Sequence, residues 1–313
     1  MKYYNQVFLM YKNFFEKLRI LDGGMGQELH ARGLISKGTL WSTSAILDEK
    51  YHNIVVDTHM AYINAGAEVI ITNNFSSRRI RMEQNKVNHL FEFANKKACQ
   101  LAIQAKKNSN KEILIAGSIP AQFDTYKEDI REEKVIYNSF NDQINCIKEY
   151  VDLFYLDVIS SGREIKIASE ILEKLQKPIL IGLHLTKNGM LPSGETISEV
   201  INRYKNERWV GVLASCVSME IAEKSIFEFK KQDLPYGYKV NLWGNEEPSP
   251  VREINTAKYD EDAVNLNTVM GKRNVTKDEF KNLGKKFIDN GATLLGGCCE
   301  TNPDHIKILS SLK

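Results

Sequence analysis

The sequence predicts an α/β protein with a single (βα)8, or TIM, barrel domain. Short apolar runs alternate with amphipathic helical segments along the chain, which is the pattern of repeated βα units. Polar residues follow the far end of each apolar run, and in a barrel these ends converge on one face. The length of 313 residues is within the range of one barrel with extended loops.

Eight apolar runs are expected to form the strands of the barrel. They cover residues 18–21, 68–72, 113–118, 151–157, 178–185, 209–216, 237–243 and 293–298. A doubly wound open sheet is the competing fold. Its first turn should carry a glycine-rich phosphate loop, and the segment Asp22-Gly-Gly-Met-Gly-Gln27 does not match that pattern.

Helical segments are expected between these strands. They cover residues 50–64, 86–107, 138–149, 163–176, 196–206, 219–231, 276–289 and 302–311, and residues 25–33 are expected to turn back over the mouth of the barrel. Two of the helices lead into their strands through Gly66-Ala67 and Gly291-Ala292, which puts glycine at the helix end.

The barrel domain is expected to cover residues 18–313. Residues 1–17 are interpreted as an N-terminal extension whose aromatic side chains pack on an outer surface. Two connections, 119–137 and 244–275, are long. Long loops on this face of a barrel either act as lids and substrate contacts or are tolerated surface insertions, and the sequence leaves both readings open.

The balance of charges favours a small-molecule partner. The 42 basic and 40 acidic residues give a formal charge of +2, which supplies no field to hold nucleic acid or an anionic membrane. No apolar run is long enough to span a membrane, and the first ten residues lack the core and cleavage site of a signal peptide. We therefore expect a cytoplasmic protein that acts on small molecules.

Five cysteines lie at positions 99, 146, 216, 298 and 299. In a reducing compartment, clustered cysteines bind metal or do chemistry more often than they form disulfides. Cys99 and Cys146 are read as small hydrophobic residues. Cys216 ends the sixth expected strand and the adjacent Cys298 and Cys299 end the eighth, so the topology brings these three thiols to one rim.

Three thiolates around one Zn²⁺ leave the fourth tetrahedral position for water or a substrate. Their softness excludes magnesium and calcium. Gly296 and Gly297 are expected to let the backbone bend so that both following cysteines face one point. A metal-free redox role for Cys298 and Cys299 is the alternative.

Five short motifs at the strand ends carry a resemblance to a known family. They are Asp22-Gly-Gly24, Thr72-Asn-Asn-Phe75, Ala116-Gly-Ser118, the single Cys216, and the segment from Gly296 to His305 that reads Gly-Gly-Cys-Cys-Glu-Thr-Asn-Pro-Asp-His. From about residue 18 to its end, the chain resembles the homocysteine S-methyltransferase family. These zinc-dependent (βα)8 enzymes methylate the sulfur of homocysteine, with betaine, S-methylmethionine, S-adenosylmethionine or methylcobalamin as the methyl donor.

The resemblance implies a role for each of seven residues. Cys216, Cys298 and Cys299 would hold the zinc ion that activates the substrate thiol, while Asp22, Gly23, Thr72 and Asp157 would line the pocket for the substrate amino acid. Asp157 stands where the family usually has a glutamate that reaches the substrate ammonium, and it is one methylene shorter.

Other departures from the family pattern concern the donor side. Ser215 replaces a common asparagine, and neither residues 118–120 nor residues 240–244 reproduce the usual motifs. His184, Phe75 and Trp243 are candidates to face a methyl donor, with a structural role or core packing as the alternative for each.

The expected activity is therefore zinc-dependent methylation of homocysteine to methionine, with S-methylmethionine or S-adenosylmethionine favoured as the donor. The alternatives are betaine as the donor, a different thiol as the acceptor, or a catalytically silent barrel that binds zinc and a thiol amino acid.

Overall fold

The computed structural model describes residues 2–247 and 270–313, and these form the predicted barrel. The eight parallel strands are β1 (Arg19–Ile20), β2 (Val69–Ile71), β3 (Leu114–Pro120), β4 (Leu153–Ile159), β5 (Ile179–Leu183), β6 (Trp209–Val217), β7 (Tyr236–Val240) and β8 (Leu294–Gly297). Their order is β1-β8-β7-β6-β5-β4-β3-β2. A parallel bridge between Leu21 and Val69 joins β1 to β2, so the sheet curls into a ring and is not an open doubly wound sheet.

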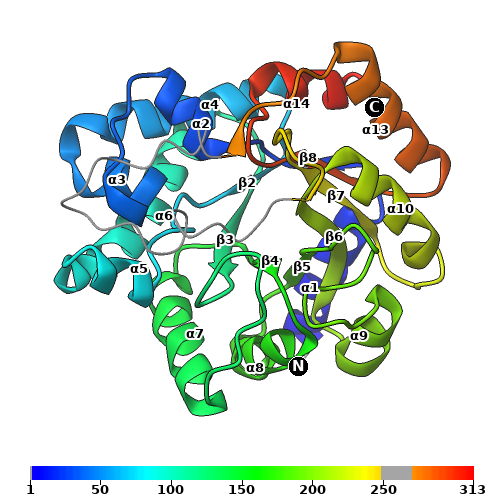
Figure 1. Cartoon of the computed structure of the whole chain (residues 1–313), viewed down its shortest axis with the longest axis horizontal. Helices are drawn as coiled ribbons and strands as arrows, with labels where there is room; N and C mark the ends of the chain where they lie inside the picture. The colour runs from blue at the N-terminus through cyan, green and yellow to red at the C-terminus, as the bar shows by residue number, and fades with distance from the viewer. Residues whose placement is uncertain (1, 248–269) are drawn as a thin grey trace.

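A helix follows every strand, as predicted, and Figure 1 shows the helices surrounding the ring of strands. The α-helices that pack around the barrel are α2 (Met25–Ala31), α3 (Ser44–Leu47), α4 (His52–Ala65), α5 (Arg79–Gln84), α6 (Phe91–Ser109), α7 (Glu133–Ile147), α8 (Gly162–Leu172), α9 (Ile197–Tyr204), α10 (Met219–Phe229), α13 (Lys277–Asp289) and α14 (Pro303–Ser310). Short 3-10 turns cover Gly38–Thr43, Glu49–Tyr51, Asn88–Leu90 and Glu173–Leu175.

The helix boundaries follow from local capping chemistry. Thr196 and Thr276 each form a capping box with a glutamate three residues later, which satisfies free backbone donors at the starts of α9 and α13. Gly66 ends α4, as the sequence pattern predicted, and adopts a left-handed conformation there. Within the described residues, none of these helices combines the length and apolar character that a membrane crossing requires.

The two long connections have different outcomes. The connection that was expected over residues 119–137 is shorter, since β3 continues to Pro120 and α7 begins at Glu133. Most of the 244–275 connection, residues 248–269, lies outside the described residues.

Two apolar layers hold the barrel together. Alternate residues of β2 show the division, because Val69 and Ile71 belong to the cluster inside the ring while Ile70 belongs to the layer between strands and helices. Tyr155 and Leu213 also lie in the inner cluster. The inside of the ring is therefore a packed core, and the space for ligands lies above it.

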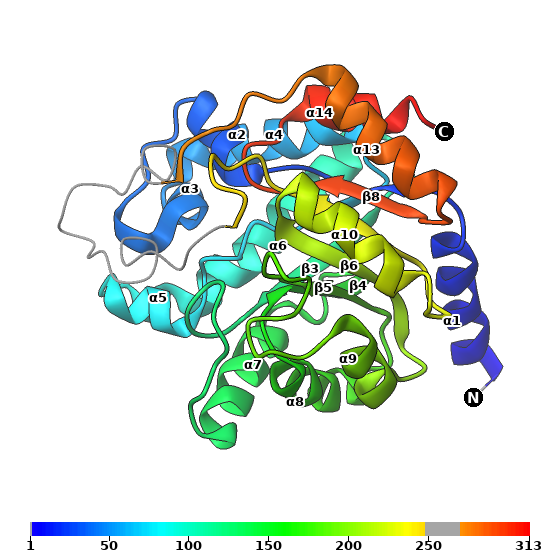
Figure 2. The same ribbon diagram turned by 45° about the vertical axis from the view of Figure 1, so that its right-hand side comes forward.

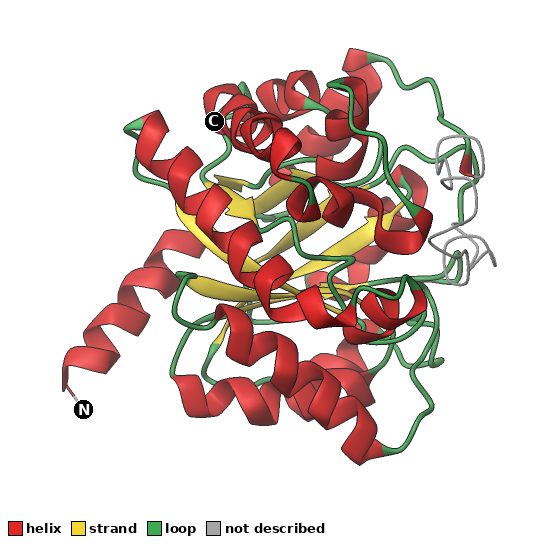
Figure 3. Cartoon of the chain, turned by 90° about the vertical axis from the view of Figure 1, so that its left-hand side faces the viewer, coloured by secondary structure: helices red, strands yellow, loops and turns green. Residues whose placement is uncertain are grey.

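The N-terminal extension forms helix α1 (Lys2–Phe15), and its end packs into the barrel. Phe15 is fully buried in the inner cluster, which differs from the outer-surface position expected for the aromatic residues of this segment. The hydroxyl of Thr293 donates to the Phe15 carbonyl oxygen at 2.7 Å, just before β8. Figures 2 and 3 show α1 at one end of the barrel and the longer loops at the other. We propose that α1 closes the end of the barrel opposite the loops.

Replacing Phe15 with alanine is expected to destabilise the whole barrel. Loss of a fully buried phenyl ring costs about 3 to 5 kcal/mol of the free energy of unfolding. Urea unfolding followed by far-UV circular dichroism measures this change. Leu9→Ala on the same helix is the matched control, because Leu9 is 53% exposed and its loss should change stability by less than about 0.5 kcal/mol. Equal effects of the two substitutions would mean that residues 1–17 are an independent extension.

Candidate active site

All seven residues that the sequence assigned to the site line one cavity at the carboxyl ends of the strands. They are Asp22, Gly23, Thr72, Asp157, Cys216, Cys298 and Cys299. The empty space of the cavity, counted out to its open mouth, is about 1090 Å³. This position is where (βα)8 enzymes hold their substrates.

The three cysteines form a compact cluster on one side of the cavity. The Sγ atoms of Cys216 and Cys299 are 3.8 Å apart, and those of Cys298 and Cys299 are 3.9 Å apart. All three sulfurs lie within 4.8 Å of one another. Tetrahedral Zn–S bonds of about 2.3 Å require separations of about 3.8 Å. The donor set and its spacing therefore fit a zinc ion with one open position.

A break in the regular strand turns Cys216 toward the cavity. The pairing of β6 with β7 shifts register between Ser215 and Val217, and Cys216 has a left-handed φ of 52°. Such a bulge re-aims a side chain that strand alternation would otherwise point outward. Asn241 holds the bulge, since its Nδ2 donates to the Cys216 carbonyl oxygen at 2.7 Å and lies 3.8 Å from the Cys216 sulfur.

Cys298 and Cys299 lie in a turn just beyond β8, so strand alternation does not apply to them. The backbone N–H of Thr301 donates to the Cys298 carbonyl oxygen at 3.1 Å and closes this turn. Gly296 and Gly297 are not among the glycines with left-handed φ angles, and the cysteines that follow them both face the cavity. Glycine is needed at 297 for room, because a Cβ atom there would lie 2.1 Å from the hydroxyl oxygen of Thr301.

Hydrogen bonds among the three sulfurs shift the pKa values of their thiols in different directions. Contacts from Cys298 and Cys299 lower the pKa of Cys216, while the contact with Cys216 raises the pKa of each of the other two. Across residues 2–247 and 270–313, this is the one group of three or more cysteine, histidine or carboxylate side chains close enough to hold a metal.

Tyr126, from the loop between β3 and α7, covers the sulfur of Cys216. Its hydroxyl lies 3.2 Å from that sulfur, and its backbone has a left-handed φ of 68°. Burial raises the pKa of Tyr126, so the phenol keeps its proton and can donate to a thiolate. His184 packs against the Tyr126 ring at 4.5 Å between ring centres and does not line the cavity. This contact supports the structural role of His184 over a role in the donor pocket.

Asp22 lies in the cavity with both carboxylate oxygens engaged. Oδ1 accepts from Lys239 Nζ at 2.7 Å, and Oδ2 accepts from the backbone N–H of Ile71 at 2.7 Å. Lys239 also donates to the Asp22 carbonyl oxygen at 2.9 Å. Burial raises the pKa of Asp22, and the Lys239 ammonium opposes that shift. The Lys239 ammonium offsets the charge of the Asp22 carboxylate, so Asp22 is not available to pair with a charged ligand.

Asp157 is the second buried carboxylate of the cavity. Its Oδ2 accepts from the Ser118 hydroxyl at 3.0 Å. Burial raises the pKa of Asp157 to about 7. The hydroxyl of Thr72 is occupied differently, because it donates to Asn74 and accepts from the backbone N–H of Ser118. Thr72 therefore shapes the cavity wall while Asp157 keeps an oxygen for a ligand.

Aromatic rings form the remaining wall. Trp41, Phe75 and Trp243 line the cavity and pack in one apolar cluster with the cysteines. Among the residues that the structure describes, the buried indole nitrogen of Trp243 and the guanidinium Nε of Arg78 have no hydrogen-bond partner. The cavity therefore presents aromatic faces and unused donors to a ligand.

Sequence reasoning missed Lys239, Tyr126, Arg78 and Trp41, which all line this cavity. A charged residue inside the apolar strand Tyr236–Val240 was a usable signal for Lys239. Tyr126 lies in an irregular loop that has no hydrophobic periodicity. Arg78 lies in a run of polar residues, where the sequence does not show which side chain is buried.

The chain is similar to proteins of one family over nearly its whole length. A family model described as homocysteine S-methyltransferase matches residues 19–312. The homocysteine S-methyltransferase 1 of Arabidopsis thaliana is 25% identical over 330 residues, covering 93% of this chain and 92% of the plant protein. The protein of the same name from Saccharomyces cerevisiae is 23% identical, with 94% of each chain covered.

A solved structure has the same fold. The metallated form of the homocysteine methyltransferase MmuM from Escherichia coli superposes with a TM-score of 0.76 at 19% identity, covering 95% of this chain and 96% of the bacterial protein. The whole-length match to the family model, on a barrel with three clustered cysteines at its mouth, decides the classification: the chain belongs to the homocysteine S-methyltransferase family.

Proposed function

We propose that this protein transfers a methyl group from a sulfonium or ammonium donor to the thiolate of L-homocysteine and so forms methionine. The observation that carries the proposal is the cluster of three cysteine sulfurs, spaced for zinc, on the wall of a cavity that also holds Asp157. Bound zinc would lower the pKa of the substrate thiol, so that the thiol reacts as a thiolate at neutral pH.

The chain's own residues fix the position of this thiol site. The Tyr126 hydroxyl and the Asn241 amide both contact the sulfur of Cys216. Hydrogen bonds to a metal ligand orient it and reduce its charge donation, which tunes the site without adding a ligand.

Asp157 is the carboxylate best placed to receive the substrate ammonium. Lys239 already offsets the charge of Asp22, whereas Asp157 is buried and holds a single hydroxyl donor, that of Ser118. Desolvation inside the cavity strengthens an ion pair between Asp157 and an ammonium group.

The aromatic wall supports a cationic methyl donor. Faces of tryptophan and phenylalanine attract sulfonium and quaternary ammonium groups. With the donor held there, the thiolate attacks the methyl carbon, the bond from that carbon to S⁺ or N⁺ breaks, and the donor leaves as a neutral thioether or amine. Proximity and alignment supply the catalysis. A sulfonium donor is favoured because a neutral thioether is a good leaving group.

The protein is expected to bind about one zinc ion per chain through the three cysteines. Cys216→Ala should abolish this metal content, as measured by elemental analysis of protein purified without chelator. Cys146→Ala is the matched control, because Cys146 is half-buried and stands outside the cluster. A zinc content that is unchanged in Cys216→Ala would contradict the proposed site, and absence of zinc from the wild type would favour the metal-free redox alternative.

Zinc-loaded protein is expected to form methionine from homocysteine with S-methylmethionine or S-adenosylmethionine, and more slowly with betaine. Chromatography of the products after incubation with each donor measures the reaction. Omission of homocysteine is the control. Homocysteine binding without methionine from any donor would contradict the proposal and leave a binding protein. Faster turnover with betaine would overturn the donor preference alone.

Binding of methionine is expected to tighten as pH rises from about 6 to about 8. Because the pKa of Asp157 is raised to about 7, the carboxylate form grows over this range while the ligand ammonium stays charged. The change in affinity should be about tenfold. Fluorescence titration measures it, since Trp41 and Trp243 line the cavity.

Asp157→Asn is expected to weaken methionine binding and remove the pH dependence. The deaminated analogue of methionine, which lacks the ammonium group, is the control ligand and should not respond to this substitution. A pH dependence that survives in Asp157→Asn would assign it to another group and contradict the role of Asp157.

A further inference from the structure

Arg78 is a buried cation on the wall of the cavity. It precedes α5, as the residue that caps the start of this helix, and its side chain is 2% exposed. Its guanidinium lies over the ring of Phe75, 5.0 Å from the ring centre. Both residues line the cavity described above.

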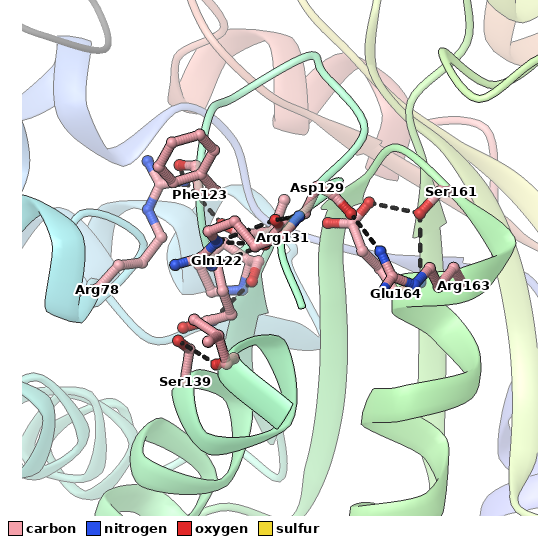
Figure 4. A network of polar contacts seen from close by, with 12 residues as sticks. Arg78, Gln122, Phe123, Asp129, Arg131, Ser139, Ser161, Arg163 and Glu164 are labelled. Carbon is pink, nitrogen blue, oxygen red and sulfur yellow. Dashed lines mark hydrogen bonds and ion pairs between the residues drawn. The ribbon is translucent and has the colours of Figure 1, made fainter. Parts of the chain in front are cut away.

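The hydrogen bonds of Arg78 go to neutral groups, while the carboxylates of Asp124 and Asp157 act on its charge from further away. Nη1 donates to the carbonyl oxygens of Ala121 and Phe123 at 2.7 and 2.9 Å, and Nη2 donates to the Thr125 hydroxyl at 3.2 Å. Figure 4 shows Arg78 beside the loop that carries Phe123. All three acceptors are neutral, and Arg78 forms no ion pair within the described residues.

Neighbouring arginines differ in this respect. Arg79 pairs with Asp142 at 2.9 Å, and Arg131 pairs with Asp129 at 2.7 Å. Burial of a charge that forms no ion pair destabilises a protein. A ligand of opposite charge can offset this cost when it binds.

The unused N–H donors of Arg78 are complementary to a carboxylate. A guanidinium has five N–H donors, of which three are engaged here, and the buried Nε has no partner. The two remaining donors are on Nε and Nη2. The edge of a guanidinium that carries these two nitrogens can bind both oxygens of a carboxylate through two parallel hydrogen bonds.

We propose that Arg78 is a carboxylate-binding subsite for the methyl donor. This proposal rests on the proposed methyl transfer, since S-methylmethionine, S-adenosylmethionine and betaine all carry a carboxylate beside the methylated cation. Phe75, in contact with Arg78, would lie near that cation. Asp22, Gly23 and Asp157 are left to surround the acceptor.

The test compares ligands that differ by one carboxylate. S-methylmethionine and its decarboxylated analogue are titrated against zinc-loaded protein, with tryptophan fluorescence as the signal. Wild type is expected to prefer S-methylmethionine. Arg78→Met should lower this preference by about ten- to a hundredfold, since hydrogen bonds to charged groups have that strength. Arg78→Lys should retain part of it.

Arg131→Met is the matched control for a structural role. Arg131 stacks on Phe123 at 4.7 Å and supports the same loop, but it does not line the cavity. It should weaken both ligands equally, if at all, and leave the preference unchanged. Equal weakening of both ligands by Arg78→Met would overturn the proposal and make Arg78 a loop anchor.

A second pair of ligands identifies which substrate carries the carboxylate. Homocysteine and its decarboxylated analogue should keep their relative affinities in Arg78→Met. Loss of preference in this pair instead would overturn the assignment to the donor.

Methionine formation is measured separately on the wild type. Turnover with an unchanged ligand preference in Arg78→Met refutes the subsite alone, and a lost preference without any turnover refutes the methyl transfer alone.

Discussion

The contact between the loop after β1 and the turn after β8 is the constraint on which the site depends. Gly24 donates its N–H to the Thr301 carbonyl oxygen at 3.2 Å, and Gly297 donates to the Asp22 carbonyl oxygen at 3.0 Å. A Cβ atom at Gly24 would lie 2.5 Å from the Cys298 carbonyl oxygen. Closure of the ring therefore places the paired cysteines and Asp22 in one cavity, and side chains larger than hydrogen would separate them.

The charges in the cavity divide into those that the protein offsets and those that it leaves for ligands. The Lys239–Asp22 pair is complete, with a 2.7 Å contact and further hydrogen bonds to each partner. Asp157 and Arg78 contact neutral protein groups instead. A complete buried pair fixes local geometry, whereas a buried charge with neutral neighbours favours a ligand of opposite charge. In the proposed function, Asp157 would receive the ammonium of the acceptor and Arg78 the carboxylate of the donor.

The sequence was sufficient for the barrel and for the group of cysteines. The hydrophobic period and the spacing of the apolar runs predict which segments become strands. The parallel topology then brings Cys216 close to Cys298 and Cys299, although nothing in the residues around Cys216 indicates this contact. The position of Phe15 was beyond such reasoning, because no pattern in a terminal helix tells which element its aromatic residue packs against. The lysine inside β7 was a usable signal, but the sequence does not show that Asp22 is its partner. Their places are decided by contacts with β8 and Asp22, across the whole chain.

The fine geometry of the sulfur site comes from backbone conformations that local sequence does not favour. Tyr126, Val158 and Cys216 all have left-handed φ angles of 50° or more, and all three line the cavity. For a β-branched residue such as Val158 this conformation costs about 1 to 3 kcal/mol, so the surrounding packing must hold it. The register shifts of β4 and β6 lie at Val158 and Cys216. Each shift lets a strand present two consecutive residues to the interior, Asp157 with Val158 on β4 and Ser215 with Cys216 on β6. The strain is thus located where a regular strand would turn the thiol away from the cavity.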